Sequence, residues 1–326
     1  MIKKPKIYNI ALIGAGNIGS RHLQALAKSK LKLNLFIIDT NNKSLTLSKS
    51  RYELLNKKKR KILYSTKLNI LPSVVDVAII ATNSNVKKKI LIEIIRRNKI
   101  RFLILEKYSF QNIKDFYAMA KIFKKKRIKT WVNCPFRYMS SYERLRKKIN
   151  CKIFHLDVRG GNWNMASTMI HYIDLFCYFT NSLKIKFIRD ELGKKIIKSK
   201  RSSFYEIKGA VKVRATNGST LEITDSYDNS PLKITFFYKN KKSIIFWKKN
   251  IIQNFNSLNK KNVIKRFKIE KQSNLTDKYV ENIIKKGSIN LPSFHESSKI
   301  QIQIINFLSK FFSKILKKNI KNCPIT

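Results

Sequence analysis

The chain has 326 residues, enough for about two ordinary domains with a sizeable core. Its composition, 43% hydrophobic and 11% aromatic, excludes an intrinsically disordered protein. The 70 Lys and Arg residues against 19 Asp and Glu give a formal net charge of +51. Because the basic residues are spread along the whole chain, we do not expect nucleic acid as the partner. The positive field would still concentrate an anionic small-molecule substrate.

Neither a metal site nor a membrane span is expected. The four cysteines show no CxxC spacing and no histidine at metal-ligand spacing, so we expect reduced thiols at Cys134, Cys151, Cys177 and Cys323. The apolar run after the basic N-terminus reaches glycines too early for a secretory signal. Every other apolar run is shorter than the ~18–20 residues of a transmembrane helix. We therefore expect a cytoplasmic protein.

The first part of the chain alternates strand-like and helix-like segments, which is typical of a doubly wound parallel sheet in a Rossmann domain. Continuous apolar runs predict buried strands at 7–14, 33–39, 74–82, 102–107 and 128–133. Helices are expected after Gly16, from the second strand to about residue 59, and over 110–126.

Pro135 marks the expected boundary between a domain at 1–135 and a domain at 136–326. In the second domain a helix at 166–179 precedes alternating strands at 206–215, 219–227 and 232–238, with an Asn-Gly turn between the first two. This pattern predicts an α+β domain with a mostly antiparallel sheet. A last helix at 297–316 carries a stripe at Ile300, Ile304, Phe307 and Phe311. We expect this stripe to face the core, not a membrane.

Residues 14–19, GAGNIG, fit the GxGxxG pattern between a predicted strand and a predicted helix. In that context the first glycine permits a tight turn, the second admits the pyrophosphate, and the third allows close helix–strand packing. Asp39 ends the next strand 20 residues later, where a carboxylate can bind the ribose hydroxyls. The motif therefore predicts a nicotinamide dinucleotide site that includes Gly14, Gly16, Asn17, Ile18, Gly19 and Asp39.

Asp39 favours NAD over NADP, because its carboxylate would repel a 2′-phosphate. Thr40, Asn41 and Asn42 provide no arginine to receive that phosphate, although Lys43 leaves NADP open.

Two further pairs of residues follow predicted strands at the sheet edge where open α/β sheets bind ligands. Thr82 and Asn83 follow the strand at 74–82, and Glu106 and Lys107 end the strand at 102–107. A lysine there can stabilise negative charge on a reacting oxygen. An ordinary surface lysine is the alternative in so basic a chain.

These features together resemble the glucose–fructose oxidoreductase, inositol dehydrogenase and MocA (Gfo/Idh/MocA) family. The resemblance rests on GAGNIGSRHLQAL, ATNS, Glu106-Lys107 and, in the second half, GGNWNMASTMIHYIDLFCYFT. It is tight over residues 7–137 and 159–181 and loose elsewhere. It implies hydride transfer between a nicotinamide dinucleotide and a sugar, cyclitol or related polyol. It also implies a second-domain sheet that supports substrate binding and can form a homo-oligomer.

The resemblance assigns catalytic roles to two residues. Lys107 corresponds to the lysine of the family's Glu-Lys-Pro motif, which contacts the nicotinamide ribose and the substrate. His171 corresponds to the acid/base that exchanges a proton with the substrate hydroxyl, which suits a side chain that titrates near neutrality.

Three positions depart from the family's pattern. Tyr108 replaces the proline of Glu-Lys-Pro, so the loop at Lys107 could have another shape. Ser167 replaces an aspartate often found four residues before His171, which removes a carboxylate–histidine pair. Lys87 replaces a histidine often found after the ATNS segment.

Several polar and aromatic residues of the second half are expected to line a substrate cleft. Arginines there would recognise a carboxylate or phosphate, which suggests an acidic or nucleotide-linked sugar. The expected substrate-binding residues are Asn133, Arg137, Trp163 and Asp174, with Arg159 and Asn162 nearby.

Three hypotheses remain open from the sequence. The first is an NAD(P)-dependent dehydrogenase or reductase that acts on CH–OH groups of a sugar derivative. The second is a non-catalytic dinucleotide-binding sensor or scaffold with the same fold, suggested by Tyr108 and Ser167. The third is a nucleic-acid-binding protein, which only the net charge supports.

Overall fold

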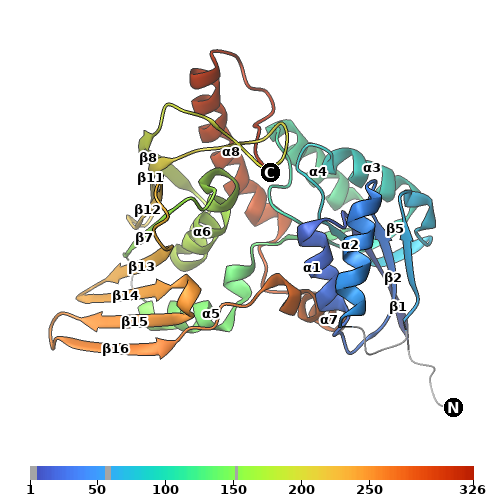
Figure 1. Ribbon diagram of the computed structural model, residues 1–326, viewed down its shortest axis with the longest axis horizontal. Helices are drawn as coiled ribbons and strands as arrows, with labels where there is room; N and C mark the ends of the chain where they lie inside the picture. The colour runs from blue at the N-terminus through green and yellow to red at the C-terminus, as the bar shows by residue number, and fades with distance from the viewer. Residues whose placement is uncertain (1–5, 56–59, 151–152) are drawn as a thin grey trace. The chain divides into compact units, whose positions relative to one another are not determined.

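The computed structural model describes residues 6–55, 60–150 and 153–326 (Figure 1). The chain divides into two compact units, which we call the N-terminal and the C-terminal unit. The N-terminal unit comprises Met1–Phe110, Lys114–Asn133 and Glu270–Phe294. The C-terminal unit comprises Gln111–Ile113, Cys134–Ile269 and His295–Thr326. The main passage from one unit to the other thus follows Asn133, whereas the sequence did not indicate that Glu270–Phe294 returns to the N-terminal unit.

The N-terminal unit contains a six-stranded sheet in the order β3-β2-β1-β4-β5-β6. All neighbouring strands are parallel, which confirms the predicted doubly wound sheet. The strands are β1 Ile7–Ile13, β2 Lys32–Ile38, β3 Ile62–Ser65, β4 Val74–Ile80, β5 Lys99–Leu105 and β6 Lys129–Val132.

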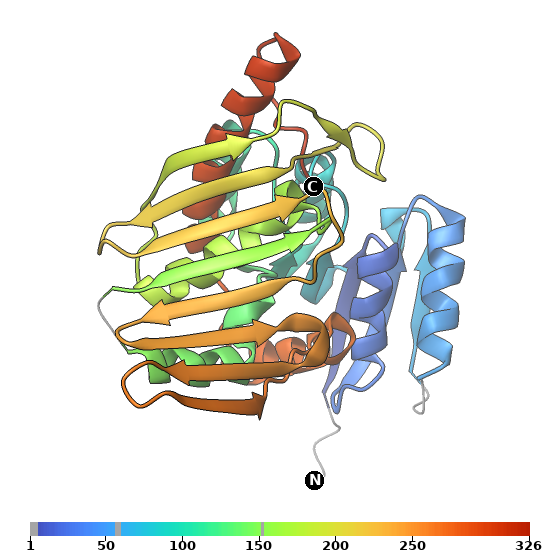
Figure 2. The same ribbon diagram turned by 60° about the vertical axis from the view of Figure 1, so that its left-hand side comes forward.

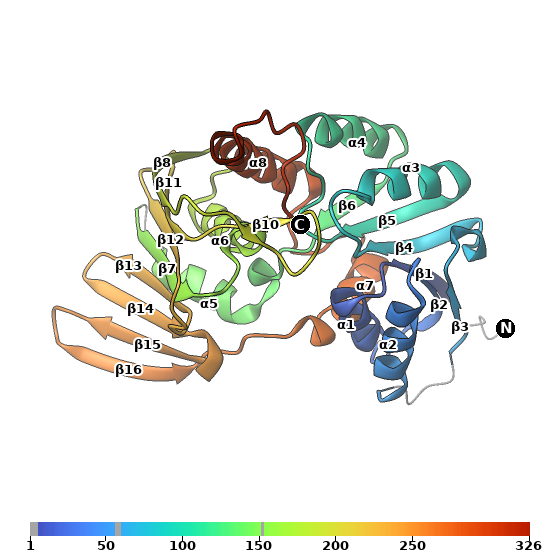
Figure 3. The same ribbon diagram turned by 45° about the horizontal axis from the view of Figure 1, so that its top comes forward.

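Helices cover both faces of this sheet, which explains why its strands are continuously apolar. Figure 3 shows α1, α2 and α7 on one face and α3 and α4 on the other. These helices span α1 Asn17–Leu26, α2 Asn42–Glu53, α3 Lys87–Arg97, α4 Ile113–Lys125 and α7 Thr276–Lys286. The single-turn helices of this unit are η1 Leu68–Ile70 and η4 Gln272–Asn274.

The returning segment is attached to the N-terminal unit by packing and by hydrogen bonds. Tyr279, Val280 and Ile283 of α7 are fully buried. The amide of Val132 in β6 donates to the carbonyl of Pro292 at 3.0 Å. The ring of Phe294 packs against Phe110, Phe116 and Phe123. This segment therefore completes the core of the N-terminal unit.

The C-terminal unit contains an eight-stranded sheet in the order β16-β15-β14-β13-β7-β12-β11-β8. Only the β7–β12 pair is parallel, so the mostly antiparallel prediction is confirmed. The strands are β7 His155–Gly161, β8 Ile185–Leu192, β11 Gly209–Ala215, β12 Thr220–Ser226, β13 Lys233–Tyr238, β14 Lys241–Phe246, β15 Ile251–Asn256 and β16 Lys261–Arg266. A separate short ribbon pairs β9 Ile197–Lys198 with β10 Tyr205–Glu206.

The predicted strand at 206–215 is in fact two strands. β10 ends at Glu206 and β11 starts at Gly209. Gly209 has φ +112° and an ideal Cβ there would lie 2.2 Å from the carbonyl oxygen of Glu191. The chain turns where only glycine fits, so the two segments join different sheets.

One face of the eight-stranded sheet packs on helices of its own unit. In Figure 2 the helices α5 Ser140–Ile149, α6 Met165–Thr180 and α8 Phe294–Leu316 lie behind the sheet. Ile300 and Ile304 of α8 are fully buried, as the predicted core-facing stripe requires. Phe307 and Phe311, the other two residues of that stripe, are only partly buried, and Leu308 and Phe312 next to them are fully buried instead. The single-turn helices here are η2 Pro135–Tyr138 and η3 Trp247–Lys249.

Among the described residues, no helix is long and apolar enough to cross a membrane. The same residues contain no cluster of three or more His, Cys, Asp or Glu side chains that could hold a metal ion. Cys134, Cys177 and Cys323 are buried and form no disulfide within the described ranges, whereas Cys151 lies outside them.

Candidate dinucleotide site and active site

The glycine motif forms the turn between β1 and α1. Gly14 has φ +94°, and an ideal Cβ there would lie 2.7 Å from the carbonyl carbon of Ala81. A Cβ on Gly19 would lie 1.8 Å from the carbonyl oxygen of Gly14. Around Gly16, in contrast, no described atom apart from those of Gly16 and its neighbours along the chain lies within 4 Å of the corresponding position. The turn is therefore closed at its first and third glycines and open at the second, as a backbone that receives a pyrophosphate requires.

Asp39 ties the end of β2 to this turn. One carboxylate oxygen, Oδ2, accepts a hydrogen bond from the amide of Ala15 at 2.7 Å. The other, Oδ1, accepts one from the amide of Asn41 at 2.9 Å. Each oxygen can accept further hydrogen bonds, so Asp39 can also bind ribose hydroxyls.

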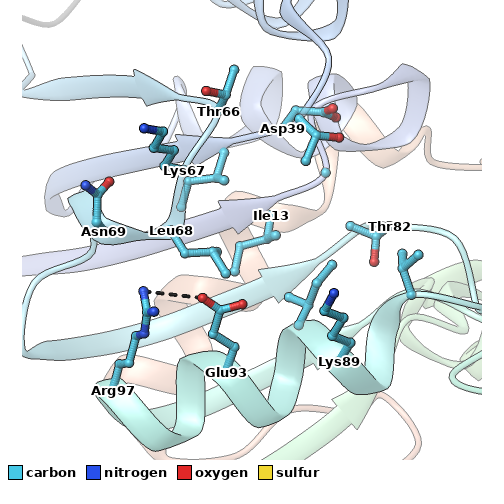
Figure 4. Close-up of a pocket in the computed structure, with 15 residues that line it drawn as sticks. Ile13, Asp39, Thr66, Lys67, Leu68, Asn69, Thr82, Lys89, Glu93 and Arg97 are labelled. Atoms are coloured by element: carbon cyan, nitrogen blue, oxygen red, sulfur yellow. Dashed lines mark ion pairs between the residues drawn. The ribbon is translucent and has the colours of Figure 1, made fainter.

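A cavity of about 630 Å³ opens beside the glycine turn (Figure 4). Its size falls in the range of sites for small molecules and cofactors. Asp39 and Thr66 lie on one side of it, and α3 contributes Glu93 and Arg97 on the other. The guanidinium of Arg97 is paired with Glu93 at 3.3 Å.

Some of the predicted cofactor residues line this cavity, and others are exposed at the start of α1 or in the loop after β4. Gly14, Asp39 and Thr82 line it, with apolar side chains such as Leu68. Asn83 follows Thr82 in the same exposed loop, and Asn17 and Ile18 are exposed at the start of α1.

Glu106, just after β5, is the centre of a buried polar network. Its Oε1 accepts hydrogen bonds from His22 Nε2 at 2.9 Å and from Asn133 Nδ2 at 2.5 Å. Burial alone would raise the pKa of Glu106, but His22, Asn133 and the charge of Lys87 lower it to about 2. The carboxylate is therefore ionised, and the side chains of Glu106 and Asn133 bond each other inside the N-terminal unit.

His22 is a functional candidate that the sequence analysis missed. Its side chain is fully buried, and Nδ1 lies 2.8 Å from Oγ1 of Thr276 and 3.3 Å from Nε2 of Gln272. Since the amide nitrogen of Gln272 can only donate, the His22 proton lies on Nε2 and points at Glu106. The available signal was a histidine next to Leu23 on the buried side of the first helix.

Lys87 is fully buried at the start of α3. Its Nζ donates hydrogen bonds to the carbonyl oxygens of Glu106 and Tyr108, each at 2.5 Å. These two carbonyls flank Lys107, whose side chain is partly exposed. The peptide bond between Lys107 and Tyr108 is cis.

In the C-terminal unit, two buried carboxylates meet the N-terminal turn of α6. Asp225 of β12 accepts from the amides of Trp163 and Met165 and from Nζ of Lys208, at 3.3, 3.1 and 2.6 Å. Glu206 of β10 accepts from the amide of Ser167 at 3.2 Å. Carboxylates are favourable there because the first amides of a helix lack partners within it.

His171 lies one turn further along α6 and is partly exposed. Its ring centroid is 5.5 Å from that of Phe136. Side chains of a helix lean toward its N-terminus, so the imidazole leans toward the turn of Ser167. Trp163, before the helix, donates from Nε1 to the carbonyl of Thr224 at 3.0 Å.

Arg137 and Asp174 form a buried ion pair. Nε and Nη2 of Arg137 donate to the two carboxylate oxygens of Asp174 at 3.0 and 2.6 Å. Burial would lower the pKa of Arg137, but Asp174 and Glu296 raise it above its ordinary value. The bidentate geometry favours a role in holding α6 against η2. Arg159 is exposed on β7, near Asp157 and Glu222.

Residues 8–134 match the GFO_IDH_MocA family, described as an oxidoreductase family with an NAD-binding Rossmann fold. Residues 8–134 therefore form a domain similar to the NAD-binding Rossmann domain of this family. The matched residues include the glycine turn, Asp39, Thr82 and the Glu106-Lys107 pair. No curated protein sequence is similar enough to count as a match.

Solved structures of family-like architecture cover nearly the whole chain. UDP-N-acetylglucosamine 3-dehydrogenase GnnA from Acidithiobacillus ferrooxidans has a TM-score of 0.70 at 11% identity, over 92% of this chain and 96% of its own. An oxidoreductase from Agrobacterium radiobacter, in complex with NAD+, L-tartaric acid and magnesium, has a TM-score of 0.65 at 14% identity, over 91% and 94%. GenD2 from gentamicin A biosynthesis, in complex with NAD, has a TM-score of 0.65 at 12% identity, over 93% and 95%. At these identities the similarity shows a shared fold.

Proposed function

We propose that this protein is a nicotinamide-dinucleotide-dependent dehydrogenase or reductase that interconverts a hydroxyl and a carbonyl group of a sugar derivative. The observation that carries the proposal is the glycine turn, open only at Gly16, beside a cavity that Asp39 lines. A dinucleotide would bind with its pyrophosphate at Gly16 and its adenosine ribose at Asp39.

NAD is the proposed cofactor in preference to NADP. The carboxylate of Asp39 is fixed by the amides of Ala15 and Asn41, so it cannot easily turn away from a 2′-phosphate. Arg97, which could otherwise attract such a phosphate, is paired with Glu93. Lys67 in the cavity wall is the feature that favours NADP instead.

Lys107 and His171 are the proposed catalytic residues. When bound, the dinucleotide supplies the acceptor or donor of the hydride. In the oxidative direction His171 takes the proton of the substrate hydroxyl, and in the reductive direction it returns that proton. The ammonium group of Lys107 stabilises the negative charge that develops on the same oxygen.

An anionic or nucleotide-linked sugar is the proposed substrate. The net charge of +51 would attract such a molecule. One protein of the same fold is a UDP-N-acetylglucosamine 3-dehydrogenase, and another comes from gentamicin A biosynthesis. Both names support a sugar derivative as the substrate class.

We also propose self-association through the eight-stranded sheet. The face of the sheet opposite α6 exposes Phe237, Phe255 and Ile264 to 40%, 40% and 62%. In the strand register Phe237 and Phe255 both pair with Lys242, so the two rings belong to one row. Lys242 stands between them, and several exposed apolar side chains on one face are typical of protein–protein contacts.

Turnover assays with NAD and NADP test the proposed reaction. The purified protein is mixed with sugars, sugar acids and nucleotide sugars, and reduction of the dinucleotide is followed by its absorbance. We expect turnover of at least one substrate, faster with NAD, and a loss of about 100-fold or more in kcat for Lys107→Met and for His171→Ala.

Lys88 is partly exposed, pairs with Asp115 and provides a matched control, because Lys88→Met makes the same chemical change outside the proposed site and should leave kcat unchanged. Unchanged turnover in both Lys107→Met and His171→Ala would refute the assigned mechanism. Thermal stabilisation by NAD without turnover of any substrate would favour a dinucleotide sensor instead.

A further inference from the structure

Lys87 is an unusual residue because its charged side chain is fully buried within the N-terminal unit. Lysine is almost never fully buried unless its charge is compensated. Two oxygens compensate it directly, the carbonyls of Glu106 and Tyr108, each 2.5 Å from Nζ. Its position at the start of α3 also departs from the histidine common in the family.

The carboxylate of Glu106 provides the negative charge for Lys87. The charge of Lys87 is among the causes that keep Glu106 ionised. That carboxylate is held in turn by His22 and Asn133, at 2.9 and 2.5 Å. The segment Glu106–Tyr108 is thus anchored at one side chain and at the two carbonyls that Lys87 binds.

Both anchored carbonyls are neighbours of Lys107. The carbonyl of Glu106 belongs to the peptide bond between Glu106 and Lys107. The carbonyl of Tyr108 belongs to the peptide bond between Tyr108 and Ser109. Fixing these groups restricts the backbone angles at Lys107, so the direction in which its Cα–Cβ bond leaves the chain is restricted as well. The side chain of Lys107 remains partly exposed, while its surroundings Tyr108 and Ser109 are fully buried.

We propose that Lys87 is a positioning residue for Lys107: its buried ammonium holds the carbonyls on either side and thereby sets the direction of the catalytic lysine. This inference rests on the proposed function of Lys107. It assigns to Lys87 a role in the rate of the reaction and none in contact with the substrate or the dinucleotide. A displacement of about 1 Å of a catalytic group can cost about 100-fold in rate.

The chemistry of the side chain suits this role. An ammonium group has three donors, which can diverge toward two carbonyls, and its charge strengthens each bond. The Nζ of Lys87 donates to the backbone carbonyls of Glu106 and Tyr108, the residues before and after Lys107.

The first test needs no substrate. Crystal structures of wild type, Lys87→Met and the control Lys88→Met are compared over residues 104–110. We expect Lys88→Met to superpose on the wild type and Lys87→Met to shift Lys107 by about 1 Å or to disorder it. An unshifted and well-ordered Lys107 in Lys87→Met would overturn the proposal.

The second test is a double-mutant cycle on kcat, with the best substrate found in the turnover assays and UDP-N-acetylglucosamine included as a probe. We expect Lys87→Met to lower kcat by about tenfold or more, with the affinity for NAD changed less than about threefold. Adding Lys87→Met to Lys107→Met should cost almost nothing further, because the residue to be positioned is already absent. An equal loss in both backgrounds would contradict a positioning role.

If Lys87→Met does not fold, Lys87→Arg and Lys87→Gln take its place. Arginine keeps the charge and can donate to both carbonyls, so we expect it to retain more kcat than glutamine, and the reverse order would overturn the proposal. The two failures are distinguishable. Wild-type kcat in Lys107→Met refutes the proposed function of Lys107. If Lys107→Met lowers kcat and adding Lys87→Met lowers it further by the same factor as in the wild type, only the role of Lys87 is refuted.

Discussion

Buried charges at Glu106 illustrate how single residues shape the candidate site. The carboxylate accepts hydrogen bonds from His22 and Asn133 and lies near the charge of Lys87. A buried carboxylate with hydrogen-bond donors and a positive charge nearby remains ionised far below neutral pH. The network therefore contributes to stability as well as to the shape of the loop at Lys107.

The pKa of Glu106 predicts a pH dependence of stability. Its pKa falls from the ordinary 4.5 to about 2 in the folded protein. The stabilisation is thus complete above about pH 4.5 and is lost as the pH falls toward 2, with a size on the order of 3 kcal/mol. We expect Glu106→Gln to be less stable than wild type near neutral pH, and the difference to shrink over this range.

Urea unfolding at a series of pH values measures this difference. Glu143→Gln is a suitable control, since the Glu143 side chain is partly exposed and pairs with Lys147 one turn away. A stability difference between wild type and Glu106→Gln that stays constant from neutral pH to about pH 2 would contradict the predicted linkage.

At the scale of elements, two glycines of the β1–α1 turn have different roles: Gly19 allows close packing, and Gly16 leaves space for a ligand. A methyl group on Gly19 would overlap the carbonyl oxygen of Gly14, whereas one on Gly16 would enter open space. We expect Gly19→Ala to lower the melting temperature, because the backbone must move. Gly16→Ala should leave the melting temperature near that of wild type and weaken NAD binding, because the methyl group occupies the path of the pyrophosphate.

Differential scanning fluorimetry and calorimetric titration with NAD measure the two effects on the same samples. Wild-type affinity for NAD in Gly16→Ala would argue against this binding mode. An unchanged melting temperature in Gly19→Ala would argue against the close packing of the turn.

The sequence predicted those elements whose signals are local. The apolar runs of β1, β2, β4 and β5 and the glycine turn could be recognised without knowledge of distant contacts. The strand β3 was not located, because it has four residues, none of them fully buried. β7 was not predicted because its segment ends in Gly160 and Gly161, and Arg159 within it was assigned to a substrate cleft.

The parts of the site that depend on distant contacts could not be predicted. His22 and Glu106 are 84 residues apart, and Glu206 reaches Ser167 across 39 residues. The sequence showed only that position 167 lacks a carboxylate. The structure places a carboxylate from β10 on the backbone of that position, which no pattern in α6 could indicate.

At the scale of the whole molecule, the two units carry different parts of the proposed function. The N-terminal unit carries the family match and the dinucleotide cavity, and the C-terminal unit carries His171 on a helix whose first turn is held by Asp225 and Glu206. Lysines and arginines occur in both units. A positive charge distributed in this way raises the local concentration of anionic ligands.

The central claim is that Lys107 and His171 act on one substrate at a bound nicotinamide. A crystal structure of the protein with NAD and an acidic or nucleotide-linked sugar tests it most directly. We expect the Lys107 ammonium and the His171 imidazole within about 3 Å of the same substrate oxygen, with the adjacent carbon facing the nicotinamide. A bound sugar whose oxygens contact neither side chain, or NAD bound away from the glycine turn, would contradict this account.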